Sequence, residues 1–148
     1  MLIPLEQWIC DRCGEIIESP SAGYTIWRSN DEGRPFDFKI IHQSRCDDRT
    51  YSCSMDIESH LGANGLTRLT SYLSPGPVQR NLGREDFKTP VDLDEFIDFF
   101  RRLQLPHYEE ARTKFASHEL LDDLSDANEV YPYQVQILKD LITRDYDA

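Results

Sequence analysis

The chain has 148 residues, 39% of them hydrophobic, which suits one domain or two small lobes that share a core. Its formal net charge of -11 disfavours nucleic acid and anionic membranes as partners, because proteins approach phosphates through clustered Lys and Arg. No stretch approaches the roughly 18 consecutive apolar residues of a membrane span, so we expect no membrane association.

Cysteine usage adds a second constraint. The first eight residues lack the charged start and apolar run of a secretory signal peptide, so we expect a cytoplasmic protein. In that compartment, four cysteines, two of them only two residues apart, are more typical of a metal site than of disulfides.

The first half of the chain has the pattern of short strands. Four runs rich in Ile, Tyr, Trp and Phe, at residues 5–9, 15–17, 24–27 and 36–41, predict a small antiparallel sheet. Turn-forming Gly, Pro, Asn and Asp separate them. After residue 54, apolar positions recur at helical spacing on both sides of a break at residues 62–65, which predicts two short helices.

Pro and Gly at residues 74–77 mark the clearest boundary. We therefore divide the chain into a zinc-binding, β-rich region (1–75), a linker (76–88) and an acidic helical region (89–148) that packs on the first as one unit. The acidic residues Asp122, Asp123 and Asp126, with Glu129 nearby, are expected to form a solvated stretch. The predicted fold class is α+β, a small zinc-bound antiparallel sheet followed by a mainly helical half.

Three helices are expected in the acidic helical region. The first starts with Thr89 as N-cap and ends near Leu105, because the following proline disfavours the α conformation in that residue. The second covers residues 106–117, with Glu109 facing outward, and the third covers residues 132–144.

One segment has residue types and spacing that require specific chemistry: Cys10-Asp11-Arg12-Cys13-Gly14, between two apolar runs. Two thiolates separated by two residues can reach one tetrahedral ion from a tight turn, and Gly14 lets the backbone aim amides at the sulfurs. Residues 8–17 resemble the first knuckle of zinc-ribbon and treble-clef modules. That resemblance implies a structural ion and a second ligand pair some tens of residues later, although the chain has no second C-x-x-C.

The second ligand pair has to come from other residues. His42 ends the fourth predicted strand, and Cys46 follows four positions later, so both can meet one ion from a single turn. The favoured ligand set is Cys10, Cys13, His42 and Cys46. An alternative set replaces His42 with Cys53, which gives four thiolates. His60, on a predicted helix, is expected at the surface or at a helix end rather than on the metal.

Four protein ligands leave no open position on the ion, so the predicted Zn²⁺ is structural and does not activate water. The first hypothesis is a zinc-stabilised intracellular binding or adaptor protein, and not an enzyme, whose acidic helical surface contacts a protein partner. A nucleic-acid-associated regulatory protein remains an alternative, using the stretch from Arg28 to Arg49, where five cations balance five acids. A metal-dependent hydrolase or nuclease is another, with a solvent ligand and Glu15 or Asp47 as base.

Overall fold

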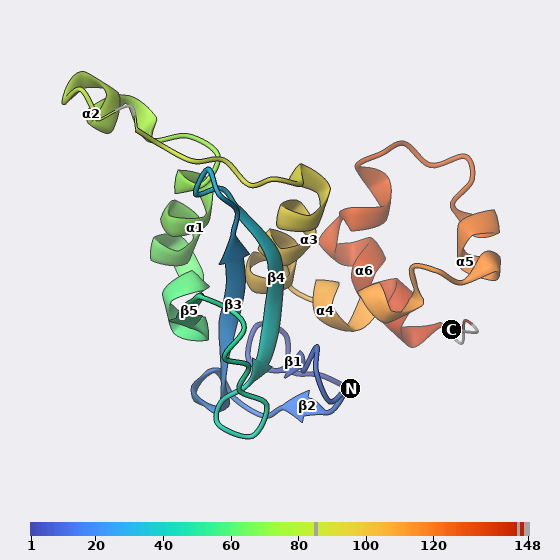
Figure 1. Cartoon of the computed structure of the whole chain (residues 1–148). Helices are drawn as coiled ribbons and strands as arrows, with labels where there is room; N and C mark the ends of the chain where they lie inside the picture. Colours follow the sequence, from blue (N-terminus) through green and yellow to red (C-terminus); the bar gives the residue numbers. More distant parts are fainter. Residues whose placement is uncertain (85, 145, 147–148) are drawn as a thin grey trace.

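The structure is a computed structural model of the whole chain, and it describes residues 1–84, 86–144 and 146 (Figure 1). Glu85 of the predicted linker lies outside the described residues, as do Asp145, Asp147 and Ala148 of the predicted helical region. The α+β prediction is confirmed, because small antiparallel sheets come first and helices dominate the rest of the described chain.

Five strands are described. A three-stranded antiparallel sheet has β3 (Gly23–Ser29) in its centre, between β4 (Pro35–His42) and β5 (Cys53–Asp56). A separate hairpin pairs β1 (Trp8–Ile9) with β2 (Ile16–Ile17), and the chain between those two strands carries the Cys10 to Cys13 motif.

One strand prediction and one helix prediction are wrong. The strand predicted over residues 5–9 is reduced to β1, because the chain turns just before it, with the Glu6 and Gln7 amides both bonded to the Ile3 carbonyl. The helix predicted from Met55 is instead strand β5, in which Met55 lies opposite Thr25 of β3. The apolar residues at 55 and 57 have the two-residue spacing of a strand, which is too short a pattern to separate strand from helix.

The helical elements, with 3-10 helices labelled η, follow in chain order: η1 (Pro20–Ala22), η2 (Ile57–His60), α1 (Gly62–Ser71), α2 (Gly76–Asn81), α3 (Leu93–Gln104), α4 (Tyr108–Ala111), η3 (Arg112–Lys114), α5 (His118–Asp123), η4 (Tyr131–Tyr133) and α6 (Val135–Thr143). The break predicted at residues 62–65 is wrong, because these residues form the first turn of α1. A Cβ on Gly65 would lie 2.0 Å from the His60 carbonyl carbon, so glycine lets α1 pack directly on η2.

Further helix boundaries also differ from prediction. The N-cap of α3 is Asp92 and not Thr89, since its carboxylate accepts the Glu95 amide at 3.2 Å. The helix predicted over residues 106–117 divides into α4 and η3. An unpredicted helix, α5, includes Asp122 and Asp123 of the expected acidic stretch, and both residues are exposed, as expected of a solvated stretch.

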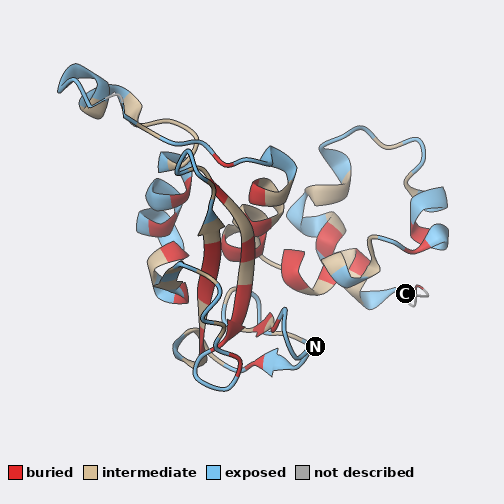
Figure 2. Cartoon of the chain, in the orientation of Figure 1, coloured by how far each residue is buried: buried red, intermediate tan, exposed pale blue. Residues whose placement is uncertain are grey.

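Two hydrophobic clusters hold these elements together (Figure 2). The larger one joins the sheets to α1 and α3, and the Phe38 ring of β4 lies at its centre, stacked 4.8 Å from the Phe99 ring of α3. The smaller cluster joins α4, α5 and α6 around Tyr108, Leu120 and Leu138. No helix in the described part of the chain is long and apolar enough to cross a bilayer.

Candidate metal centre

A tight turn between β1 and β2 holds the first two cysteines. The Cys10 amide donates to the Glu15 carbonyl at 2.9 Å, and the Gly14 amide donates to the Cys10 carbonyl, also at 2.9 Å. Gly14 has φ 76°, a left-handed conformation that costs glycine little. The Arg12 amide lies 3.4 Å from Cys10 Sγ, so the turn directs a backbone donor at that sulfur, as the sequence predicts.

The second pair of side chains arrives at the end of β4. The turn docks on that strand through Asp11, whose amide donates to the Ile40 carbonyl at 2.9 Å. The Asp11 carboxylate in turn accepts the Ile40 amide at 2.7 Å. Because His42 follows two residues later, and Cys46 lies in the turn after β4, this docking brings both residues beside the cysteine turn.

The ligand atoms of Cys10, Cys13, His42 and Cys46 all lie within 4.8 Å of one another. His42 Nδ1 is 3.4 Å from Cys13 Sγ and 3.9 Å from Cys46 Sγ. A tetrahedral Zn²⁺ with ordinary bond lengths separates a sulfur and a nitrogen ligand by about 3.6 Å. The favoured ligand set is therefore brought together at a spacing that can hold a metal ion.

The His42 ring is oriented by a bond on its far side. Nε2 lies 3.1 Å from the Ile16 carbonyl, to which it donates when the proton is on Nε2. That tautomer leaves the Nδ1 lone pair directed at the three sulfurs. Metal-bound histidines normally donate their other ring nitrogen to a carbonyl or carboxylate in this way.

The thiols differ strongly in acidity. Burial raises the pKa of Cys10, but the Cys13 and Arg12 amides and His42 outweigh it and bring the pKa to about 6. Burial also raises the pKa of Cys46, and the neighbouring Cys10 and Cys13 sulfurs add to this, giving about 11. Three adjacent thiols cannot all ionise without a compensating cation, which is the environment that a bound divalent ion would stabilise.

A cation stands beside the exposed side of the site. Arg45 Nη2 lies 3.7 Å from Cys13 Sγ and also forms an ion pair with Glu15. Zn²⁺ with three thiolates carries a net charge of −1, which the Arg45 guanidinium offsets. Asp47, the other carboxylate considered as a base, accepts the Tyr24 hydroxyl at 2.8 Å and the Ser44 amide at 2.7 Å.

The two other candidate ligands lie elsewhere. Cys53 begins β5, where its Sγ is 3.7 Å from the Ser29 hydroxyl, and it is not part of the described cluster. His60 ends η2, as a helix-end residue, but the prediction of a surface position is wrong, because its side chain is fully buried. Its ring packs edge-on against the rings of Trp27 and Phe99.

A buried ion-pair network next to the cysteine turn escaped prediction. Arg102 of α3 donates to both carboxylate oxygens of Glu109 at 2.7 and 2.8 Å, and to Asp11 at 2.7 Å. The outward orientation predicted for Glu109 is wrong, because the residue is only 6% exposed. Nothing in the local pattern signals this network, since Asp11 lies 91 residues before Arg102 and only the fold brings the two together.

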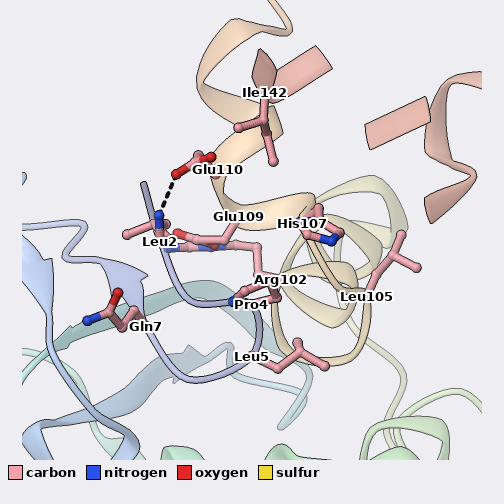
Figure 3. Close-up of a pocket in the computed structure, with 10 residues that line it drawn as sticks. All are labelled: Leu2, Pro4, Leu5, Gln7, Arg102, Leu105, His107, Glu109, Glu110 and Ile142. Atoms are coloured by element: carbon pink, nitrogen blue, oxygen red, sulfur yellow. Dashed lines mark hydrogen bonds and ion pairs between the residues drawn. The ribbon is translucent and has the colours of Figure 1, made fainter. Parts of the chain in front are cut away.

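The N-terminal loop covers this network (Figure 3). Leu2, Pro4 and Leu5 line the same cavity as Arg102 and Glu109, and the Leu2 amide bonds to Glu110. The cavity that remains has a volume of about 10 Å³, room for one water molecule at most. Arg102 thus ties the cysteine turn to the helices.

Comparison of the chain with protein-family models, with curated proteins and with solved structures found no match. The geometry of the site therefore carries the functional interpretation.

Proposed function

We propose that this chain is a zinc-stabilised binding or adaptor protein, in which Cys10, Cys13, His42 and Cys46 hold one structural Zn²⁺ in a knuckle of the zinc-ribbon or treble-clef type. The observation that supports it is the convergence of three sulfurs and one imidazole nitrogen within 4.8 Å. Thiolate and imidazole donors in a tetrahedral set suit zinc. The bound ion would lock the cysteine turn to the end of β4.

The arrangement favours a structural role over hydrolysis. Four protein donors leave no coordination position for water, and an open position is what a catalytic zinc needs. Glu15 and Asp47, the two carboxylates considered as a base, are already bonded to Arg45 and to Tyr24. The reduced thiols that such a site requires fit a cytoplasmic location.

A protein partner is favoured over nucleic acid. Three of the cations that made residues 28–49 a candidate surface are engaged by carboxylates: Arg28 and Lys39 by Asp37, at 3.1 and 3.7 Å, and Arg45 by Glu15. Paired cations contribute little to phosphate binding. The acidic helical region, in contrast, is suited to a partner with a basic face.

Cobalt substitution tests the closed coordination. We expect Co²⁺ to bind with the intense visible absorption of a tetrahedral thiolate complex, and expect that absorption to be unaffected by anions that compete for water positions. A weak, six-coordinate spectrum, or one that such anions change, would support the hydrolase alternative instead.

Affinity capture with the zinc-loaded full chain tests the binding role. We expect the chain to retain a protein that elutes when salt is added and that stays bound after nuclease treatment. The Cys46→Ser chain should not retain this protein. Retention that disappears after nuclease treatment would favour the nucleic-acid alternative.

A further inference from the structure

Helix α2 buries no side chain against the described part of its own chain. Figures 1 and 2 show it held away from the rest of the molecule, and none of its residues is buried. Val78 is 68% exposed and Leu82, at its C-terminal end, is 60% exposed. The Leu82 amide donates to the Val78 carbonyl at 3.1 Å, so the two apolar side chains are one turn apart on the same side.

A helix of six residues is not stable in water by its own hydrogen bonds. Isolated helices shorter than about 12–15 residues are marginal, and helices in proteins depend on packing of an apolar face. Proline at the start of α2 restricts the backbone conformations of this segment, but it does not bury Val78 or Leu82. The apolar face of α2 therefore needs a partner surface to be stabilised.

The acidic helical region has an open apolar groove. It lies between α5 and η4 and has a volume of about 330 Å³. The lining residues are Phe115, Leu120, Leu121, Leu124, Ser125, Pro132 and Tyr133. Leu121 is 52% exposed at this groove, and Arg101 stacks on the Tyr133 ring at 4.2 Å from its centroid, which holds that wall in place.

The charges of the two features are complementary. Residues 115–138, which build most of the groove, contain five acidic residues and no Lys or Arg. Within the described chain, Asp123 pairs with Arg144, and the other four acids of this stretch form no ion pair. Residues 76–84, which contain α2, have Arg80 and Arg84 and no acidic residue.

We infer that α2 of one chain docks its Val78 and Leu82 face into the α5–η4 groove of a second copy. Figure 1 shows α2 and α5 at opposite ends of the molecule, so one chain cannot make this contact with itself. Helices are commonly recognised by a groove that takes up apolar side chains spaced one turn apart, and opposite charges steer the encounter. The contact is small, so the association is weak.

This inference rests on the proposed function only in treating the acidic helical region as a binding surface. Sedimentation equilibrium of the zinc-loaded full chain, from about 10 μM to about 500 μM at low salt, tests it. We expect the average mass to rise toward that of a dimer or above, and added salt to reverse the rise. We expect Leu82→Asp and Leu121→Asp each to lower the association constant at least about tenfold.

Charge reversal gives a second test that does not touch the apolar residues. Arg80→Glu with Arg84→Glu should weaken association, and adding Asp122→Lys and Asp126→Lys to the same chain should restore it. The matched control is Leu66→Asp, at a 43% exposed position on α1, which should have no effect.

A chain that stays monomeric over the whole range would overturn the inference, as would association that either Leu82→Asp or Leu121→Asp leaves unchanged. Capture of a different protein by that monomeric, zinc-loaded chain would leave the proposed function standing.

Discussion

His42 links the candidate metal to the β1–β2 hairpin, because its ring faces the sulfurs with one nitrogen and the Ile16 carbonyl with the other. Cys46 completes the set from a buried position. We predict that Cys46→Ser loses stoichiometric zinc and melts at a lower temperature, since a hydroxyl is a much poorer ligand than a thiolate. Elemental analysis and thermal unfolding measure both effects.

The matched control is Cys53→Ser, which changes the same atom in a residue outside the cluster. It should keep one zinc and nearly the full melting temperature. Zinc lost by Cys53→Ser as well as by Cys46→Ser, but retained by His42→Ala, would support the four-thiolate alternative.

His60 makes the stability of the fold depend on pH. Burial, with a smaller effect of the Arg68 charge, lowers its pKa from 6.5 to about 4. Between these values the unfolded chain takes up a proton that the folded chain excludes, so stability is lost as the pH falls through this window. We expect a loss of about 2 kcal/mol between pH 7 and pH 5 from this residue.

Acid also weakens metal binding, so the contribution of His60 is the difference between the wild-type chain and His60→Gln. Urea unfolding at both pH values measures it. Equal pH dependence in the two chains would show that the His60 ring is solvated and not buried.

The sequence identifies single residues well where spacing decides their role. Cys10 and Cys13 come together because two residues separate them, and His42 and Cys46 because a strand end and a turn present them to one point. The burial of Arg102 and Glu109 could not be predicted from the sequence. Charged residues are buried only when an oppositely charged partner lies next to them, and here Asp11 comes from a distant part of the chain.

At the scale of an element, the start of α3 gives a direct test. Asp92 caps the helix through the Glu95 amide, whereas the sequence favours Thr89 because a proline follows it. We predict that Asp92→Ala lowers the free energy of unfolding by about 1 kcal/mol and that Thr89→Ala has little effect. Chemical unfolding of the two variants measures the difference, and the reverse order would place the helix start at Thr89.

Elements with short or mixed patterns are the ones that sequence reasoning misplaces. Strand β5 has four residues, too few to show a period, and its pairing with β3 decides its conformation. Helix α5 escapes prediction because acidic residues dominate it and only Leu120 is buried. Long amphipathic α3 is predicted, because its apolar face repeats over three turns.

At the scale of the whole molecule, Arg102 joins the cysteine turn to α3 and α4. We predict that Arg102→Leu lowers the free energy of unfolding by about 3–5 kcal/mol, because Glu109 and Asp11 are left buried without a cation. Denaturant unfolding measures it. Should this variant fail to fold, Glu109→Gln keeps the shape of the side chain and should show a smaller loss.

The matched control is Arg112→Leu, which removes a partly exposed cation paired with Asp98 at 2.8 Å. Its loss of stability should be clearly smaller than that of Arg102→Leu. Equal losses of stability would mean that the buried network stabilises the fold no more than the ion pair of Arg112 with Asp98 does.

The zinc content of the whole chain tests the central claim most directly. Native mass spectrometry of the full chain, purified without added metal or chelator, should show one zinc per molecule and no disulfide. A folded chain that carries no metal, with its cysteines as free thiols or oxidised in pairs, would contradict the account.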